Sequence, residues 1–134
     1  MDIKSAATLK NLTPDIIIGK LFSYHNTAHM YHFQTHTIGH HELLDELYKA
    51  LVSSKDAIGE YLLGVQAPER FGSVVIDQIE PYSDENLMRF LIEGFQCTVA
   101  IIEYAKSKNL EQLANLASDL QGHFVKAKLF MTYK

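Results

Sequence analysis

The chain has a single cysteine and no long apolar run. Of its 134 residues only Cys97 is a cysteine and none is a tryptophan, so an internal disulfide and a cysteine-based zinc site are both excluded. The longest early apolar run, residues 16–18, is far short of the about 20 residues that a membrane span needs. We therefore expect a soluble, cytoplasmic domain with no membrane partner, in which Cys97 is an inert core thiol.

Basic residues are also scarce. Twelve lysines and arginines face sixteen aspartates and glutamates, which gives a net charge of −4 with histidine neutral. Only Lys4 and Lys10 are cationic in the first fifteen residues, so the start of the chain has neither a polybasic arm nor the layout of a signal peptide. Because affinity for DNA phosphates depends on clustered basic residues, we expect no tight DNA binding near physiological salt.

The composition and the periodicity of apolar residues predict one all-α domain over residues 1–134. Apolar residues make up 47% of the chain and charged residues 21%, which is typical of a globular domain. Thr13-Pro14-Asp15 is a helix start, with an N-cap, a proline at the first position and an acid in the first turn. The helix that follows breaks around residues 34–39. The second helix is expected from His40 to Leu63, with Gly64 just beyond its end.

A connection follows at residues 67–81, with a short helix expected near residues 72–78. Ser83 opens the third helix, which ends near Lys106, and Lys108-Asn109 links it to the fourth. Two helix pairs joined by one long link predict a ferritin-like up-down four-helix bundle, with a longer crossover between helices two and three. A plain four-helix interaction module has the same pattern.

Histidine is concentrated in one region, since six of the seven histidines fall between His25 and His41. At ~100° per residue, one histidine and three acidic residues of the second helix share one face, at about 0°, 40°, 60° and 100°. These residues are His41, Asp45, Asp56 and Glu60. The apolar residues point the opposite way and are expected in the core; they are Leu44, Leu47, Leu51, Ile58 and Leu62.

The polar face is too long for one metal site within one chain. At 1.5 Å per residue, His41 and Glu60 stand about 28 Å apart, whereas metal bonds are only ~2 Å long. A second copy packed antiparallel across a two-fold axis would bring His41 and Asp45 of one chain near Asp56 and Glu60 of the other. His29, at the end of the first helix, is expected to point near His41. Imidazoles with carboxylates suit Fe(II), Mn(II) or Zn(II).

The full spacing, from His29 to Glu60, is His-x11-His-x3-Asp-x10-Asp-x3-Glu, and it includes the stretches from His41 to Tyr48 and from Asp56 to Glu60. This pattern resembles the ferroxidase motif of the Dps family, the ferritin-like DNA-binding proteins from starved cells, or mini-ferritins. The resemblance is strongest over residues 20–64.

The resemblance implies a fold, an activity and an assembly. Family members bind Fe(II) between two subunits, oxidise it with hydrogen peroxide or oxygen, and store ferric mineral inside a twelve-subunit cage. On this reading His29 and His41 of one chain and Asp56 and Glu60 of its neighbour are the iron ligands, and Asp45 is a ligand or supports one. The expected metal is iron, in a mono-iron or di-iron site that also accepts Zn(II) or Mn(II) in vitro. The expected assembly is a homo-oligomer, at least a two-fold dimer.

The chain also departs from the family pattern. Met30 stands where the family often has tryptophan, which leaves Tyr31 or Tyr48 as a candidate electron donor, and Gln34 stands where the loop glycine would fall. The lysine-rich tail is absent. The alternative function is a non-catalytic ferritin-like oligomer with a structural metal, an interaction role or a DNA-packaging role. The roles of the remaining histidines of the cluster, His25, His32, His36 and His40, stay open, and His123 is expected to be a hydrogen-bonded packing residue.

Overall fold

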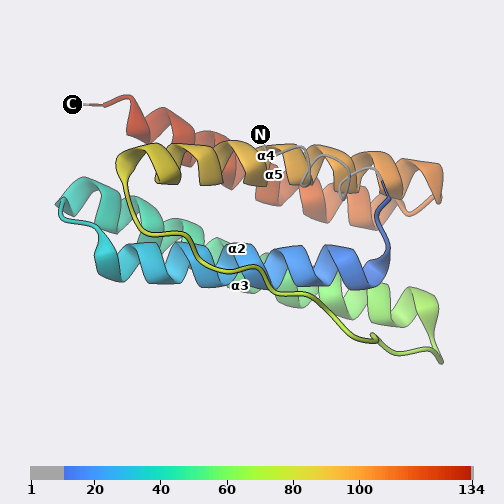
Figure 1. Cartoon of the computed structure of the whole chain (residues 1–134). Helices are drawn as coiled ribbons and strands as arrows, with labels where there is room; N and C mark the ends of the chain where they lie inside the picture. The colour runs from blue at the N-terminus through green and yellow to red at the C-terminus, as the bar shows by residue number, and fades with distance from the viewer. Residues whose placement is uncertain (1–10, 134) are drawn as a thin grey trace.

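The structure, a computed structural model, describes residues 11–133, which form four long α-helices and contain no strand (Figure 1). The helices are α2 (Pro14–Gln34), α3 (Ile38–Gln66), α4 (Asp84–Ser107) and α5 (Glu111–Met131). The expected all-helical, four-helix chain is therefore confirmed. Among the described residues, no helix combines the length and the apolar character that crossing a membrane requires.

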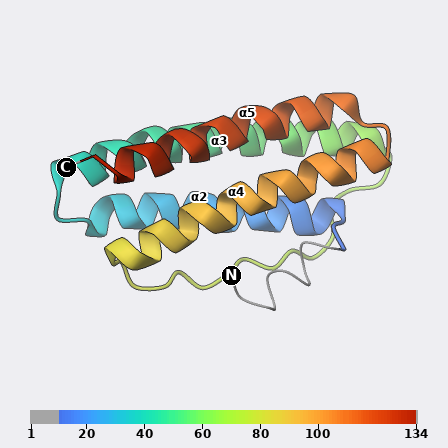
Figure 2. The same ribbon diagram turned by 90° about the horizontal axis from the view of Figure 1, so that it is seen from above.

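The helices form two antiparallel pairs laid against each other (Figures 1 and 2). α2 packs on α3 and α4 packs on α5, while α3 with α5 and α2 with α4 join the two pairs. The connection at residues 67–83 runs back along the length of the bundle, so α3 and α4 point in the same direction (Figure 1).

The helix starts follow the capping residues. The Thr13 hydroxyl accepts a hydrogen bond from the Ile16 amide at 3.3 Å, and the Ser83 hydroxyl accepts one from the Asn86 amide at 2.9 Å. Both N-caps were expected, because each hydroxyl satisfies an amide that has no partner inside its helix. The link between α4 and α5 is also confirmed as a tight turn, in which Asn109 has a φ of 58°.

Two expectations about α3 and the connection that follows it are wrong. α3 is longer than residues 40–63 at both ends, and Gly64 lies inside it, because the helix continues to Gln66 and ends only before Pro68. The connection contains no helix near residues 72–78. It lies extended along α2 instead, because its polar groups bind that helix.

Three contacts hold the connection against α2. The Gly72 amide donates to Asp15 at 3.0 Å, the Asp77 amide donates to the Ser23 hydroxyl at 2.8 Å, and Lys20 pairs with the Asp77 carboxylate at 3.2 Å. The connection lies so close to α2 that a Cβ added at Gly19 would stand 2.7 Å from the carbonyl oxygen of Val75.

The core is built around a cluster of aromatic rings from three helices. Phe90 of α4 lies 5.9 Å from both Tyr24 of α2 and Phe124 of α5, measured between ring centroids, and Tyr31 of α2 joins the cluster at 6.0 Å from Phe90. Gly94 of α4 leaves the space that the Phe124 ring occupies, since a Cβ there would overlap the ring. The contact between α4 and α5 therefore depends on the missing side chain at position 94.

We predict opposite effects for the same substitution at two helical glycines. Gly94→Ala should destabilise the fold by about 1–3 kcal/mol, because overpacking against Phe124 outweighs the gain in helix propensity. Gly122→Ala, where nothing lies within 4 Å of the added Cβ, should stabilise the protein by up to about 1 kcal/mol. Chemical denaturation of both variants measures this, and a Gly94→Ala variant as stable as the wild type would contradict the packing argument.

Candidate metal centre

The predicted polar face of α3 is exposed, and its apolar face is buried. His41, Asp56 and Glu60 are exposed and Asp45 is half-buried. The residues expected in the core are confirmed there, each no more than 2% exposed: Leu44, Leu47, Leu51, Ile58 and Leu62. We call the exposed stripe of His41, Asp45, Asp56 and Glu60 the ligand face.

His41 is held by the backbone of α2. Its Nδ1 lies 3.0 Å from the carbonyl oxygen of His32, and the Nδ1 of His32 lies 3.2 Å from the carbonyl oxygen of His41. The two rings stack with centroids 3.8 Å apart. Since a carbonyl only accepts hydrogen bonds, each Nδ1 carries the proton and each Nε2 keeps its lone pair in the neutral ring.

His29 has different neighbours. Its ring stacks on Tyr48 of α3, with centroids 4.0 Å apart and planes 17° apart, and it lies 4.9 Å from the ring of Phe33. Within the described residues, the imidazole that touches His41 belongs to His32 and not to His29. The sequence placed His29 near His41 and left His32 without a role.

The carboxylates of the ligand face differ in what they bind. Asp45 accepts a hydrogen bond from Lys49 at 2.8 Å, and this bond, with the positive charge of Lys49 and the nearby imidazoles, lowers the pKa of Asp45. Asp56 and Glu60 make no hydrogen bond or ion pair with other described residues. Both are therefore available to a cation or to a partner.

His25 was not expected to have a defined role, but the structure gives it one in the contact between α2 and α3. Its ring stacks on Tyr48 at 5.1 Å, and Lys55 donates to its Nδ1 at 3.3 Å. The Nε2 atom is buried without a hydrogen-bond partner in the described part of the chain. Burial and then the charges of Lys55 and His29 lower the pKa of His25, while Asp56 acts in the opposite direction.

One chain alone does not complete a metal site in the part that is described. No group of three or more histidine, cysteine or acidic side chains converges closely enough to hold an ion among residues 11–133. Within residues 11–133 the ligand face therefore forms no complete metal site by itself.

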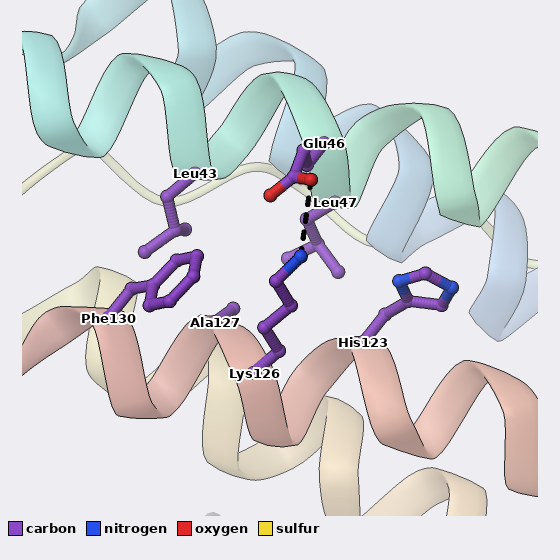
Figure 3. Close-up of a pocket in the computed structure, with 7 residues that line it drawn as sticks. All are labelled: Leu43, Glu46, Leu47, His123, Lys126, Ala127 and Phe130. Carbon is purple, nitrogen blue, oxygen red and sulfur yellow. Dashed lines mark hydrogen bonds and ion pairs between the residues drawn. The ribbon is translucent and has the colours of Figure 1, made fainter.

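A small cavity lies on the opposite side of α3, where this helix meets α5 (Figure 3). It has a volume of about 10 Å³ and lies between α3 and α5, beside an ion pair of Glu46 with Lys126 at 3.3 Å. This volume holds about one water molecule, so a substrate does not fit. His123 lines the cavity but is exposed, and no described residue forms a hydrogen bond with it. The expected hydrogen-bonded packing role of His123 is therefore wrong.

Comparison with protein-family models, with curated proteins and with solved structures finds no match to this chain.

The lowered pKa of His25 predicts a loss of stability in acid. Because the folded state binds this proton less readily than the unfolded state, whose pKa is near 6.5, stability falls as the pH drops from 6.5 through the lower folded value. We expect the metal-free wild type to lose more thermal stability between about pH 7.5 and about pH 5.5 than the His25→Gln variant does. Thermal melts across this range test it, and parallel curves for the two proteins would contradict the assignment.

Proposed function

We propose that this protein is a Dps-like mini-ferritin that binds Fe(II) between two copies of the chain, oxidises it and stores the ferric product. The observation that carries the proposal is the ligand face itself. Its residues have the spacing of the ferroxidase motif, they point away from the core, and Asp56 and Glu60 have no partners among the described residues.

The bundle supports the same proposal. α3 and α4 point in the same direction, and the connection at residues 67–83 spans the length of the bundle between them. This is the connectivity of ferritin-like bundles with one long crossover. We propose that the chain shares that fold.

Two chains are needed because of the length of the ligand face. His41 and Glu60 lie on one continuous helix about 28 Å apart, so no single ion reaches both within a chain. In an antiparallel two-fold pair, His41 and Asp45 face the partner's Asp56 and Glu60, and the pair has two equivalent sites.

The ligand set fits Fe(II) as the substrate. His41 is exposed and its Nε2 keeps a lone pair, and carboxylates with imidazoles are the donors that Fe(II) accepts. In the proposed reaction two Fe(II) ions each give one electron to hydrogen peroxide. The O–O bond breaks, and two protons complete two water molecules. A reducing cytoplasm, in which Fe(II) persists, is the setting that we propose.

A contrast between two residues of α3 tests the chemistry separately from the fold. His41→Ala should abolish most Fe(II) binding and oxidation but change the stability of the metal-free protein by only about 1 kcal/mol or less, since an exposed hydrogen bond contributes little. Leu47→Ala should cost about 2–5 kcal/mol through the cavity it leaves, with oxidation intact in the folded fraction. Iron-oxidation progress curves and thermal melts measure both effects.

The result that would contradict the proposal is a His41→Ala protein that unfolds without metal but oxidises iron at the wild-type rate per folded molecule. Tight metal binding without turnover in the wild type would favour the non-catalytic alternative.

Mixing two inactive variants tests whether the site spans two chains. A His41→Ala chain and an Asp56→Asn/Glu60→Gln chain should each be inactive alone. When unfolded together and refolded as an equal mixture, they should recover about a quarter of the wild-type activity, because half of the dimers are mixed and each mixed dimer has one intact site of two. No recovery, despite mixed oligomers detected by mass spectrometry, would place the site within one chain.

A further inference from the structure

Three apolar side chains lie on the ligand face of α3. Ile38 is 79% exposed, and Val52 and Leu63 are half-buried and lie outside the described core and the side chains packed against it. At ~100° per residue from His41 they stand at about 60°, 20° and 40°, within the arc of the candidate ligands. Because Ile38 keeps most of its surface in water, it contributes little to the folding of a single chain.

The types of side chain along this face have the same order in both directions. Ile38 stands three residues before His41, and Leu63 stands three residues after Glu60. Val52 lies near the middle, between the two pairs of candidate ligands. The order is therefore apolar, ligands, apolar, ligands, apolar from either end of the face.

An antiparallel two-fold pair would match this order to itself. A two-fold axis that brings His41 level with the partner's Glu60 also brings Ile38 level with the partner's Leu63, and the two aliphatic side chains differ by only about 20° around the helix. The contact occurs twice in the pair, at points about 38 Å apart along α3. A shift by one helix turn would separate both contacts by about 5 Å.

We propose that Ile38 and Leu63 form an apolar contact with a second copy of this chain at each end of the ligand face, and that these two contacts set the register in which the ligands of the two chains meet. The antiparallel pair rests on the proposed function, but the contact does not require that iron is oxidised. Carboxylates repel one another in any register without metal, whereas two buried aliphatic contacts favour a single register.

Cross-linking of two cysteine variants tests the contact directly. An Ile38→Cys chain and a Leu63→Cys chain are refolded as an equal mixture with Mn(II), which prefers oxygen and nitrogen donors to thiolates, and are treated with a short bismaleimide. Up to about half of the chains should form a covalent dimer on a denaturing gel, because half of the pairs are mixed and each mixed pair has one doubly substituted contact. Either variant alone should form almost none, since Cys97 is buried.

A mixture of Val125→Cys and Leu63→Cys chains is the matched control. Val125 is an exposed apolar residue of α5, away from the ligand face, so this mixture should form far less covalent dimer. Strong cross-linking of the Ile38→Cys chain alone would mean that the two copies of α3 run parallel, and would overturn the inference. The absence of a cross-link in the first mixture, despite mixed oligomers detected by mass spectrometry, would also overturn it.

The strength of pairing in Mn(II), measured by analytical ultracentrifugation, gives a second readout. Ile38→Asn should weaken pairing by about 10-fold or more, because each pair loses two buried aliphatic contacts, and Val125→Asn should leave it unchanged. Equal effects of the two substitutions would contradict the inference. A wild type that stays monomeric with Mn(II) would contradict both this inference and the proposed function.

Fe(II) oxidation by the wild type separates the two proposals. Pairs that cross-link between positions 38 and 63 but oxidise no iron would support the contact and contradict the ferroxidase proposal. Iron oxidation that is restored by mixing the two inactive variants, without the cross-link, would retain the proposed function and overturn this inference.

Discussion

The constraint on which the candidate site depends is the straightness of α3. A helix of 29 residues is a rod about 43 Å long, and its leucines and isoleucine hold one side of that rod in the core. The opposite side cannot bend back on itself. The candidate ligands at its two ends therefore face solvent as separate groups, and the exposure of Asp56 and Glu60 follows from the same packing that buries Leu47 and Leu51.

Rings take the place of aliphatic side chains along part of the contact between α2 and α3. His25, His29 and His32 succeed one another along α2, and the residues that meet them on α3, among them Tyr48, recur every seven positions. Stacked rings bury their flat faces, and the Nδ1 atoms of His32 and His41 still reach backbone carbonyls. Two aliphatic rows would exclude water equally well but would offer no nitrogen atoms for hydrogen bonds. The mixed contact thus combines packing with hydrogen bonds between the two helices.

The helices could be predicted largely from local signals. Thr13 and Ser83 mark helix starts because their hydroxyls satisfy free amides, and the core face of α3 follows from its period. Gly64 misled the prediction, since an interior glycine costs only about 1 kcal/mol and the helical hydrogen bonds continue past it. Residues 72–78 lie extended because Asp15, Lys20 and Ser23 of α2 bind them. A single sequence contains no signal for such distant partners.

Part of the candidate site could be predicted from the sequence, and part could not. The common face of His41, Asp45, Asp56 and Glu60 follows from helix geometry alone and could be predicted. Which imidazole of α2 contacts His41 depends on how far α2 and α3 are shifted along each other by the turn at residues 35–37. This shift is set by the packing of the two helices, so the spacing of histidines along α2 does not distinguish His29 from His32. The reciprocal Nδ1–carbonyl bonds are compatible with one shift only.

Charge makes metal binding and the pairing of chains depend on each other in the proposed assembly. An antiparallel pair brings together Asp45, Asp56 and Glu60 from both copies, and Lys49 is the one lysine that pairs with a carboxylate of the ligand face among the described residues. Removing unpaired carboxylates from water is costly, so pairing of the two chains is unfavourable without metal. In the proposed pair, a divalent cation bound by His41 and Asp45 reverses this balance, since the partner's carboxylates then meet a positive charge. Any ligand that binds the paired state more tightly than the single chain stabilises the pair. The carboxylates that oppose pairing without metal therefore favour pairing when a divalent cation is bound.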